Sequence, residues 1–257
     1  GIYRYLNLVY LPEVSVASLR VEPVLDAKMK KGAIKVTGTF YNPADVREAS
    51  VEVTVRNAKG DVVSTRTLDK ITPLGDLVLL DVQMDKPQLW DVDNPALYTC
   101  EVTVTSNGQK MTASERFGFR AFEFIEKGPF MLNGRRLLLR GTHRHEDHAG
   151  VAAAMTEEQM IQEMKMMKEM GVNFIRLGHY QQSEIVLNLC DELGLLLYTE
   201  SFDMWERTKT DYDYGNDFKN WWKKDLTSWV RQDRNHPCVF IWGIGNEIYD
   251  TPVSYTH

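Results

Sequence analysis

The chain has 257 residues, of which 43% are hydrophobic and 11% aromatic, enough for one large or two ordinary domains with a sizeable core. Its formal net charge of -6 comes from interspersed acidic and basic residues, which argues against nucleic acid and an anionic membrane surface as partners. No apolar stretch approaches the roughly 20 residues that span a bilayer. The cysteines lie far apart without CxxC spacing, which predicts buried thiols and neither a disulfide framework nor a zinc site; they are Cys100, Cys190 and Cys238.

The leading segment, residues 1–13, reads as the interior of a strand that belongs to a preceding domain. It has neither a basic n-region nor a cleavage pattern, and the sequence favours neither a periplasmic nor a cytoplasmic location. Residues 14–122 then alternate apolar and polar side chains with a period of two, as in "IKVTGTF" and "VEVTV". Turn signals separate these strands, and Asn107-Gly108 is a strong hairpin signal. The pattern predicts a β-sandwich of immunoglobulin type.

Residues 123–257 alternate strands with helices. Buried strands are expected at 136–141, 173–178, 195–200 and 238–245, with helices that begin after Thr156, after Ser183 and near residue 217. Short connections and continuously apolar strands call for a parallel sheet covered by helices. This pattern fits either a doubly wound sheet or the first half of a (β/α)8 barrel.

Polar residues at the strand ends favour the barrel. In such barrels the loops at the C-terminal ends of the strands converge on one active site. Here every strand is followed by polar side chains without an evident structural role, and we expect them to share a site: Thr142 to His145, His179 and Tyr180, Glu200 and Asp203, and Asn246 and Glu247.

Two chemistries could use this set. His143 and His145 have a spacing that can present two imidazoles to one divalent metal, with His148 and His179 as further candidates, which would make the protein a metal-dependent hydrolase. The alternative is glycoside hydrolysis, with Glu247 as a general acid/base that an apolar surround keeps partly protonated. A carboxylate directly after an Asn suits protonation of a leaving oxygen better than metal binding.

Four segments in order resemble one family. "LNGRRLLLRGTHRHEDHAG", "NFIRLGHY", "LCDELGLLLYTESFDMW" and "VRQDRNHPCVFIWGIGNEI" are similar to glycoside hydrolase family 2, which includes β-galactosidases, β-glucuronidases and β-mannosidases. The sandwich resembles the family's immunoglobulin-like domain, and "GIYR" resembles the end of its jelly-roll sugar-binding domain.

The resemblance implies roles for individual residues. Glu247 would be the acid/base and Asn246 the partner of the sugar 2-hydroxyl, with His145 and His179 contacting substrate. Arg176 would organise the catalytic carboxylates. Apart from the resemblance, Glu200 is expected to be a buried partner of Arg176 or of the histidines, in preference to a direct catalytic role. Asp203, a polar residue at a strand end, and Trp205, whose aromatic face could bind the apolar face of a sugar, are also expected to bind substrate.

Some β-galactosidases of the family bind a metal shortly after the third strand, but here that stretch has the form Asp203-Met204-Trp205, so no metal or other cofactor is expected. The same form favours the β-galactosidase-type subgroup.

The family's nucleophile would lie on a later strand, so the resemblance implies a fragment of a larger enzyme, inactive by itself. A half-barrel would expose two sheet edges and an apolar interior, which favours aggregation or pairing with another copy as a homo-oligomer. A third hypothesis is a non-catalytic carbohydrate-binding or assembly module centred on the sandwich.

Overall fold

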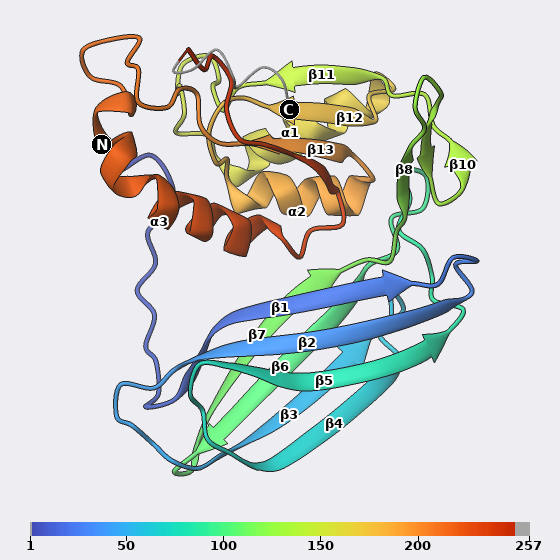
Figure 1. Cartoon of the computed structure of the whole chain (residues 1–257), viewed down its shortest axis with the longest axis vertical. Helices are drawn as coiled ribbons and strands as arrows, with labels where there is room; N and C mark the ends of the chain where they lie inside the picture. The colour runs from blue at the N-terminus through green and yellow to red at the C-terminus, as the bar shows by residue number, and fades with distance from the viewer. Residues whose placement is uncertain (1, 250–257) are drawn as a thin grey trace. The chain divides into compact units, whose positions relative to one another are not determined.

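A computed structural model of the chain describes residues 2–249. Gly1, in the predicted segment 1–13, and residues 250–257, in the predicted domain 123–257, lie outside the described residues. The β-sandwich consists of two antiparallel sheets (Figure 1). One has the order β1-β2-β5 and the other the order β4-β3-β6-β7. The strands are β1 Ser15–Leu25, β2 Lys31–Tyr41, β3 Ala49–Arg56, β4 Val62–Ile71, β5 Asp76–Asp85, β6 Tyr98–Ser106 and β7 Gln109–Phe117.

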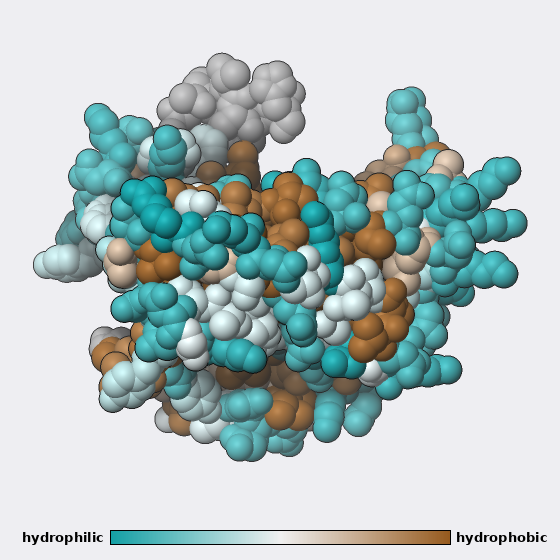
Figure 2. Space-filling view, turned by 90° about the horizontal axis from the view of Figure 1, so that it is seen from below, coloured by the Kyte–Doolittle hydropathy of each residue, from teal (hydrophilic) through white to brown (hydrophobic). Residues whose placement is uncertain are grey.

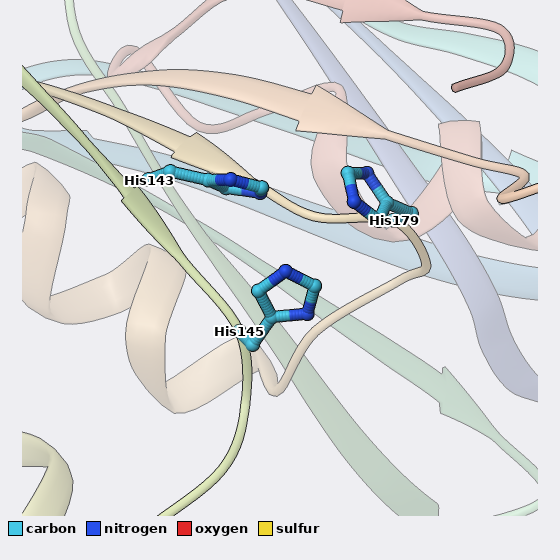
Figure 3. Close-up of side chains that lie close together, drawn as sticks. All are labelled: His143, His145 and His179. Atoms are coloured by element: carbon cyan, nitrogen blue, oxygen red, sulfur yellow. The ribbon is translucent and has the colours of Figure 1, made fainter. Parts of the chain in front are cut away.

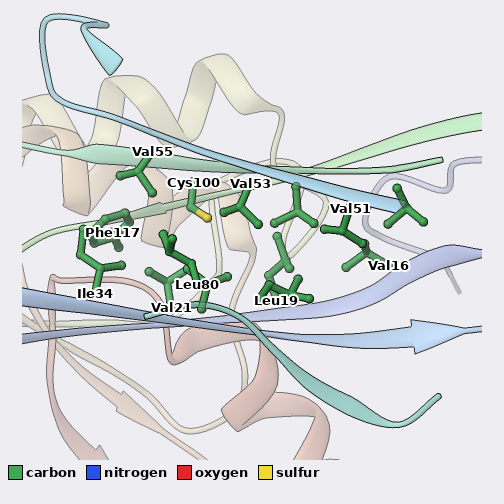
Figure 4. Packing of buried hydrophobic residues seen from close by; sticks show 14 of the residues in the cluster. Val16, Leu19, Val21, Ile34, Val51, Val53, Val55, Leu80, Cys100 and Phe117 are labelled. Atoms are coloured by element: carbon green, nitrogen blue, oxygen red, sulfur yellow. The ribbon is translucent and has the colours of Figure 1, made fainter. Parts of the chain in front are cut away.

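The inward-facing side chains of the two sheets form the core of the sandwich (Figure 4). Val53 and Val55 of β3 are fully buried, and Val102 of β6 packs in the same cluster. Their polar neighbours face outward, as the period of two predicts. Cys100 lies in this core as a free thiol, and burial, followed by the charge of Glu115, raises its pKa to about 12. Cys190 and Cys238 are also free and buried, so the prediction of buried thiols is confirmed.

The predicted hairpin joins β6 to β7. Asn107 and Gly108 have φ of 50° and 75°, and both signs fit the type of two-residue turn that this dipeptide favours. Phe117, at the end of β7, stacks on Tyr98 with ring centroids 5.5 Å apart. Exposed large hydrophobic residues are concentrated in residues 2–11, and others are distributed along the rest of the described chain; Figure 2 shows hydrophobic patches among hydrophilic ones on one face.

Residues 2–14 contain no strand in the structure, so the strand expected there is absent from the described residues. Its assignment to a preceding domain stays a prediction. After the sandwich, a small antiparallel sheet has the order β10-β9-β8; its strands are β8 Phe122–Phe124, β9 Phe130–Leu132 and β10 Arg135–Arg136.

The second half forms a parallel four-stranded sheet in the order β11-β12-β13-β14. Its elements are β11 Gly141–Arg144, α1 Glu157–Glu169, β12 Phe174–Leu177, α2 Glu184–Leu193, β13 Leu196–Glu200, α3 Gly215–Asp233 and β14 Val239–Gly243. The strand order follows the chain without reversal, so right-handed connections place the helices on one face of the sheet, as Figure 1 shows. A doubly wound sheet would reverse its order, and the half-barrel is therefore confirmed.

Local signals set the helix boundaries. Thr156 and Gln159 form a capping box at the start of α1. Ser183 accepts a hydrogen bond from the Ile185 amide at the start of α2, and Gly194 ends that helix with φ of 68°. In the described part of the chain, no helix is long and apolar enough to cross a membrane.

The strand predicted over 136–141 is wrong in position. The paired strand β11 begins only at Gly141, and Leu138 is 64% exposed. The Asn173 side chain provides the reason: its Nδ2 donates to the Leu138 carbonyl at 2.9 Å, and its Oδ1 accepts from the Arg140 amide at 2.7 Å. These bonds take the place of strand pairing, and the segment joins the sheet where Gly141 lets Phe174 approach closely.

Candidate active site

All four parallel strands end at the same edge of the sheet, and the expected polar residues follow them there. His145 follows β11, His179 follows β12 and Glu200 ends β13. Asn246 and Glu247 follow β14. Backbone hydrogen bonds continue past the sheet, since the amides of Asn246 and Glu247 each donate at 3.0 Å to carbonyls of the loop after β13. This pairing fixes the Asn-Glu pair beside that loop.

A buried carboxylate organises this edge. Glu200 has a fully buried side chain, and Arg176 donates to both of its oxygens at 2.9 to 3.1 Å. His179 Nδ1 lies 2.5 Å from Glu200 Oε1. A carboxylate paired with a guanidinium is ionised and only accepts hydrogen bonds, so His179 donates from Nδ1. Glu200 therefore positions its neighbours and has no oxygen directed at solvent.

Arg176 and Asp203 fix the side-chain amide of Asn246. Arg176 Nη2 donates to Asn246 Oδ1 at 2.8 Å, and Asn246 Nδ2 donates to Asp203 Oδ1 at 3.0 Å. Because the donor and the acceptor are both identified by chemistry, the amide has one orientation. Arg176, Asn246 and Asp203 therefore form one connected hydrogen-bond network with Glu200.

Glu247 has a different environment from the one expected. Its side chain is 52% exposed, and Lys209 forms ion pairs with Glu247 and Asp203. The apolar surround expected for Glu247 is absent from the described residues. Burial alone would raise the pKa of Asp203, but hydrogen bonds from Lys209 and Asn246 lower it below its ordinary value. Burial acts to lower the pKa of Lys209, while the bonds to its two carboxylates raise it.

Three imidazoles lie beside this network (Figure 3). The ring centroids of His143, His145 and His179 are 4.7 to 5.0 Å apart. One nitrogen of each ring lies within 4.8 Å of the others, so the group could hold a metal ion. Partial burial, followed by the nearby charges of His145 and Arg176, lowers the pKa of His143 and favours its neutral form. His148, the fourth histidine considered, is not in this group.

Trp205 lies half-buried in the loop after β13. Its indole N–H donates to the Ile244 carbonyl at 2.8 Å, and its ring stacks on Phe218. The residue therefore fastens the end of β14 to this loop. A cleft of about 430 Å³ opens next to the network; it is lined by residues that include Arg4, His179, Asp203, Met204, Tyr214 and Trp229.

Sequence reasoning missed three residues of this edge. Lys209 bridges two carboxylates, Arg4 forms an ion pair with the buried Glu146, and the Tyr198 hydroxyl contacts Glu200. Only Tyr198 had a usable signal, because it lies two residues before Glu200 in the same strand and faces the same side of the sheet.

Comparison with known proteins is decisive for the family. Residues 124–255 match the family model described as "Glycosyl hydrolases family 2, TIM barrel domain", and residues 14–120 match the model "Glycosyl hydrolases family 2". The chain belongs to glycosyl hydrolase family 2. The fold and the family expected from the four motifs are therefore confirmed.

Proteins similar to this chain carry different names. A β-glucuronidase from Parabacteroides merdae, solved by crystallography, is 55% identical, with a TM-score of 0.88 over 95% of this chain and 30% of its own. β-Glucuronidase 3 from Bacteroides uniformis is 46% identical, with a TM-score of 0.84 over 95% of this chain and 30% of its own. β-Galactosidase BoGH2A from Bacteroides ovatus is 34% identical over 86% of this chain and 26% of its own length. The chain thus spans 20% to 26% of the length of the first curated relatives that it matches.

Proposed function

We propose that the whole protein is a retaining β-glycosidase in which Glu247 is the general acid/base. The observation that carries this proposal is the position of Asn246 and Glu247 after β14, on the same edge of the sheet as His145 and His179. Family 2 membership supports it. A carboxyl group at the mouth of a barrel can protonate the glycosidic oxygen and then activate water.

Neighbours of Glu247 would prepare the site. Asn246 is held by Arg176 and Asp203, which suits a fixed hydrogen bond to a sugar hydroxyl. His179 is oriented by Glu200 through Nδ1, which leaves Nε2 for contact with a substrate. We assign His145 and Trp205 to the walls of the sugar site, with Arg176 and Glu200 as positioning residues.

The second carboxyl group of a retaining enzyme lies roughly 5 to 5.5 Å from the first. Glu200 does not suit attack on a sugar, because Arg176 and His179 engage its oxygens and it is fully buried. We therefore assign the nucleophile to a later strand of the whole protein, as the family resemblance implies.

Two sugars are candidates. The Asp203-Met204-Trp205 form favours a β-galactoside, whereas the relatives with higher identity are named β-glucuronidases. The difference between 55% and 34% identity favours a β-glucuronide. Measuring kcat/KM of the whole protein for an aryl β-glucuronide and for an aryl β-galactoside would decide between the two sugars.

The acid/base role is tested by Glu247→Ala in the whole protein. Turnover of substrates with poor leaving groups should fall by about 10²- to 10⁴-fold, because they need protonation, while activated aryl glycosides should lose less in the glycosylation step. Glu206→Ala, which removes an exposed glutamate of the neighbouring loop, is the matched control and should retain activity. Equal loss on both substrate types would contradict the role.

A further inference from the structure

His143, His145 and His179 approach one another from two neighbouring strand ends. Figure 3 shows the three rings turned toward one another. The exposed rings of His143 and His145 face water, whereas His179 is half-buried. The group has no acidic member of its own, because Glu200 is directed to Nδ1 of His179 and to Arg176.

The contact with Glu200 gives His179 a defined chemical state. Nδ1 donates to Glu200, so in the neutral imidazole the lone pair lies on Nε2, which is the nitrogen that could bind a metal. A histidine that donates its other N–H to a carboxylate is the usual arrangement of a metal ligand, because the carboxylate fixes the ring and increases its basicity. The buried ion pair with Arg176 holds that carboxylate in place.

The His143 ring packs against the backbone of Gly178. A Cβ on Gly178 would overlap the His143 ring, so the ring occupies the space that this glycine leaves open. Zinc binds imidazole nitrogens at about 2.0 to 2.1 Å, which places the nitrogens of a tetrahedral site about 3.4 Å apart. Those of the present group lie within 4.8 Å of one another. Small side-chain adjustments that bring the nitrogens of His143 and His145 closer by roughly 1 Å would complete the geometry.

We propose that His143, His145 and His179 form a binding site for a divalent transition-metal ion of the Zn²⁺ type. Three neutral nitrogen ligands suit such an ion and leave one coordination position for water or another oxygen. His145 and His179 are also the residues assigned to the sugar site. A bound ion would then exclude the sugar, and the metal would act as a competitive inhibitor. This competition rests on the proposed glycosidase function, whereas binding of the ion does not.

Metal binding is tested on the chain itself with Zn²⁺ by calorimetry and with Co²⁺ by visible absorption. We expect one ion per chain and the intense absorption of a tetrahedral cobalt site. His143→Ala and His145→Ala should each weaken binding by more than about tenfold. His148→Ala removes an exposed histidine outside the group and should bind like the unmodified chain. Circular dichroism verifies that each variant is folded. Absence of one-to-one binding, or an equal loss in His148→Ala, would overturn the site.

The competition is tested on the whole protein with an aryl glycoside. Zn²⁺ should raise KM without changing kcat, and His143→Ala should weaken that inhibition relative to His148→Ala. If zinc binds without raising KM, the proposed competition with the sugar is wrong, but the proposed metal site is not contradicted. A whole protein that hydrolyses no glycoside in the absence of zinc would instead contradict the proposed function, and the calorimetric result would be unaffected.

Discussion

Lys209 places its ammonium group against the Glu247 carboxylate, and the same ammonium bonds Asp203 at 2.8 Å. On the proposed function, a glycosidic oxygen can reach Glu247 only if this ion pair opens or if the free carboxylate oxygen takes the substrate. Lys209, in the loop after β13, therefore occupies part of the Glu247 carboxylate.

Replacing Lys209 by Met should reduce stability in a pH-dependent way. The folded pKa of Asp203 lies below its ordinary value of 3.8, because Lys209 and Asn246 outweigh the effect of burial. Its contribution is therefore complete above the unfolded pKa and is lost as the pH falls through the folded pKa. For Lys209 the folded pKa lies above 10.5, so its contribution is present below that pH and is lost as the pH rises further.

The difference in Tm between the unmodified chain and Lys209→Met should be constant from about pH 5 to 9 and shrink at both extremes. The groups are partly exposed, so the effect should be at most about 1 kcal/mol. Thermal unfolding followed by circular dichroism measures it. Lys219→Met, an exposed lysine of α3, serves as control. A difference in Tm that persists at pH 2 would contradict the assignment to Asp203.

The sequence predicts those features that depend on neighbouring residues. Thr156 with Gln159, and Ser183 with Gly194, mark helix ends because the capping groups lie within one turn of the backbone that they bond. The common edge of the strand ends is predictable too, since parallel strands share direction. The environment of Glu247 was not predictable, because the position of Lys209 depends on how a loop of irregular structure folds back.

Arg4 provides another case of a contact that the sequence does not signal. Its guanidinium forms an ion pair with Glu146, whose side chain is fully buried, and donates to the Gln181 carbonyl at 2.9 Å. It therefore joins the segments that follow His145 and His179. Two residues so far apart in the chain have no shared periodicity that could reveal the pair.

Arg4→Ala should destabilise the half-barrel by about 3 kcal/mol, because it leaves the buried Glu146 carboxylate without its cation. The double variant Arg4→Ala/Glu146→Gln should recover part of this loss, since the unpaired charge is then removed. Hydrogen exchange should accelerate at residues 145–148 and 179–182 in the single variant. Chemical denaturation gives the free energies of unfolding. A double variant less stable than the single one would contradict the ion-pair explanation.

Arg176→Lys should impair the site while retaining its charge. Lysine cannot form the two-pronged contact with Glu200 and reach Asn246 at the same time. In the whole protein we expect kcat/KM to fall by about 10²-fold, since misplacement of a positioning network costs this much. If Asn246 binds the sugar 2-hydroxyl, the Arg176→Lys change should lower kcat/KM much less for a 2-deoxyglycoside than for the parent glycoside. Equal losses for both sugars would show that Arg176 acts on something other than Asn246.

Gly243 of β14 makes room for Tyr198 of β13. A Cβ on Gly243 would lie 2.6 Å from the Tyr198 hydroxyl oxygen and would also overlap the ring. Burial, followed by the charge of Glu200, raises the pKa of Tyr198 above its ordinary value of 10.0. The ring therefore lies against the carboxylate that orients His179 and Arg176.

Gly243→Ala should displace Tyr198 and destabilise the chain by about 1 to 3 kcal/mol through overpacking. Because the displaced hydroxyl leaves Glu200, the pKa of Tyr198 should move back toward 10.0, which ultraviolet difference titration measures against a Tyr198→Phe reference. Tyr198→Ala in the Gly243→Ala background removes the overlap and should lower the stability less than the two separate changes together. Strictly additive losses, with the phenol titrating as before, would mean that the added methyl group is accommodated without moving the ring.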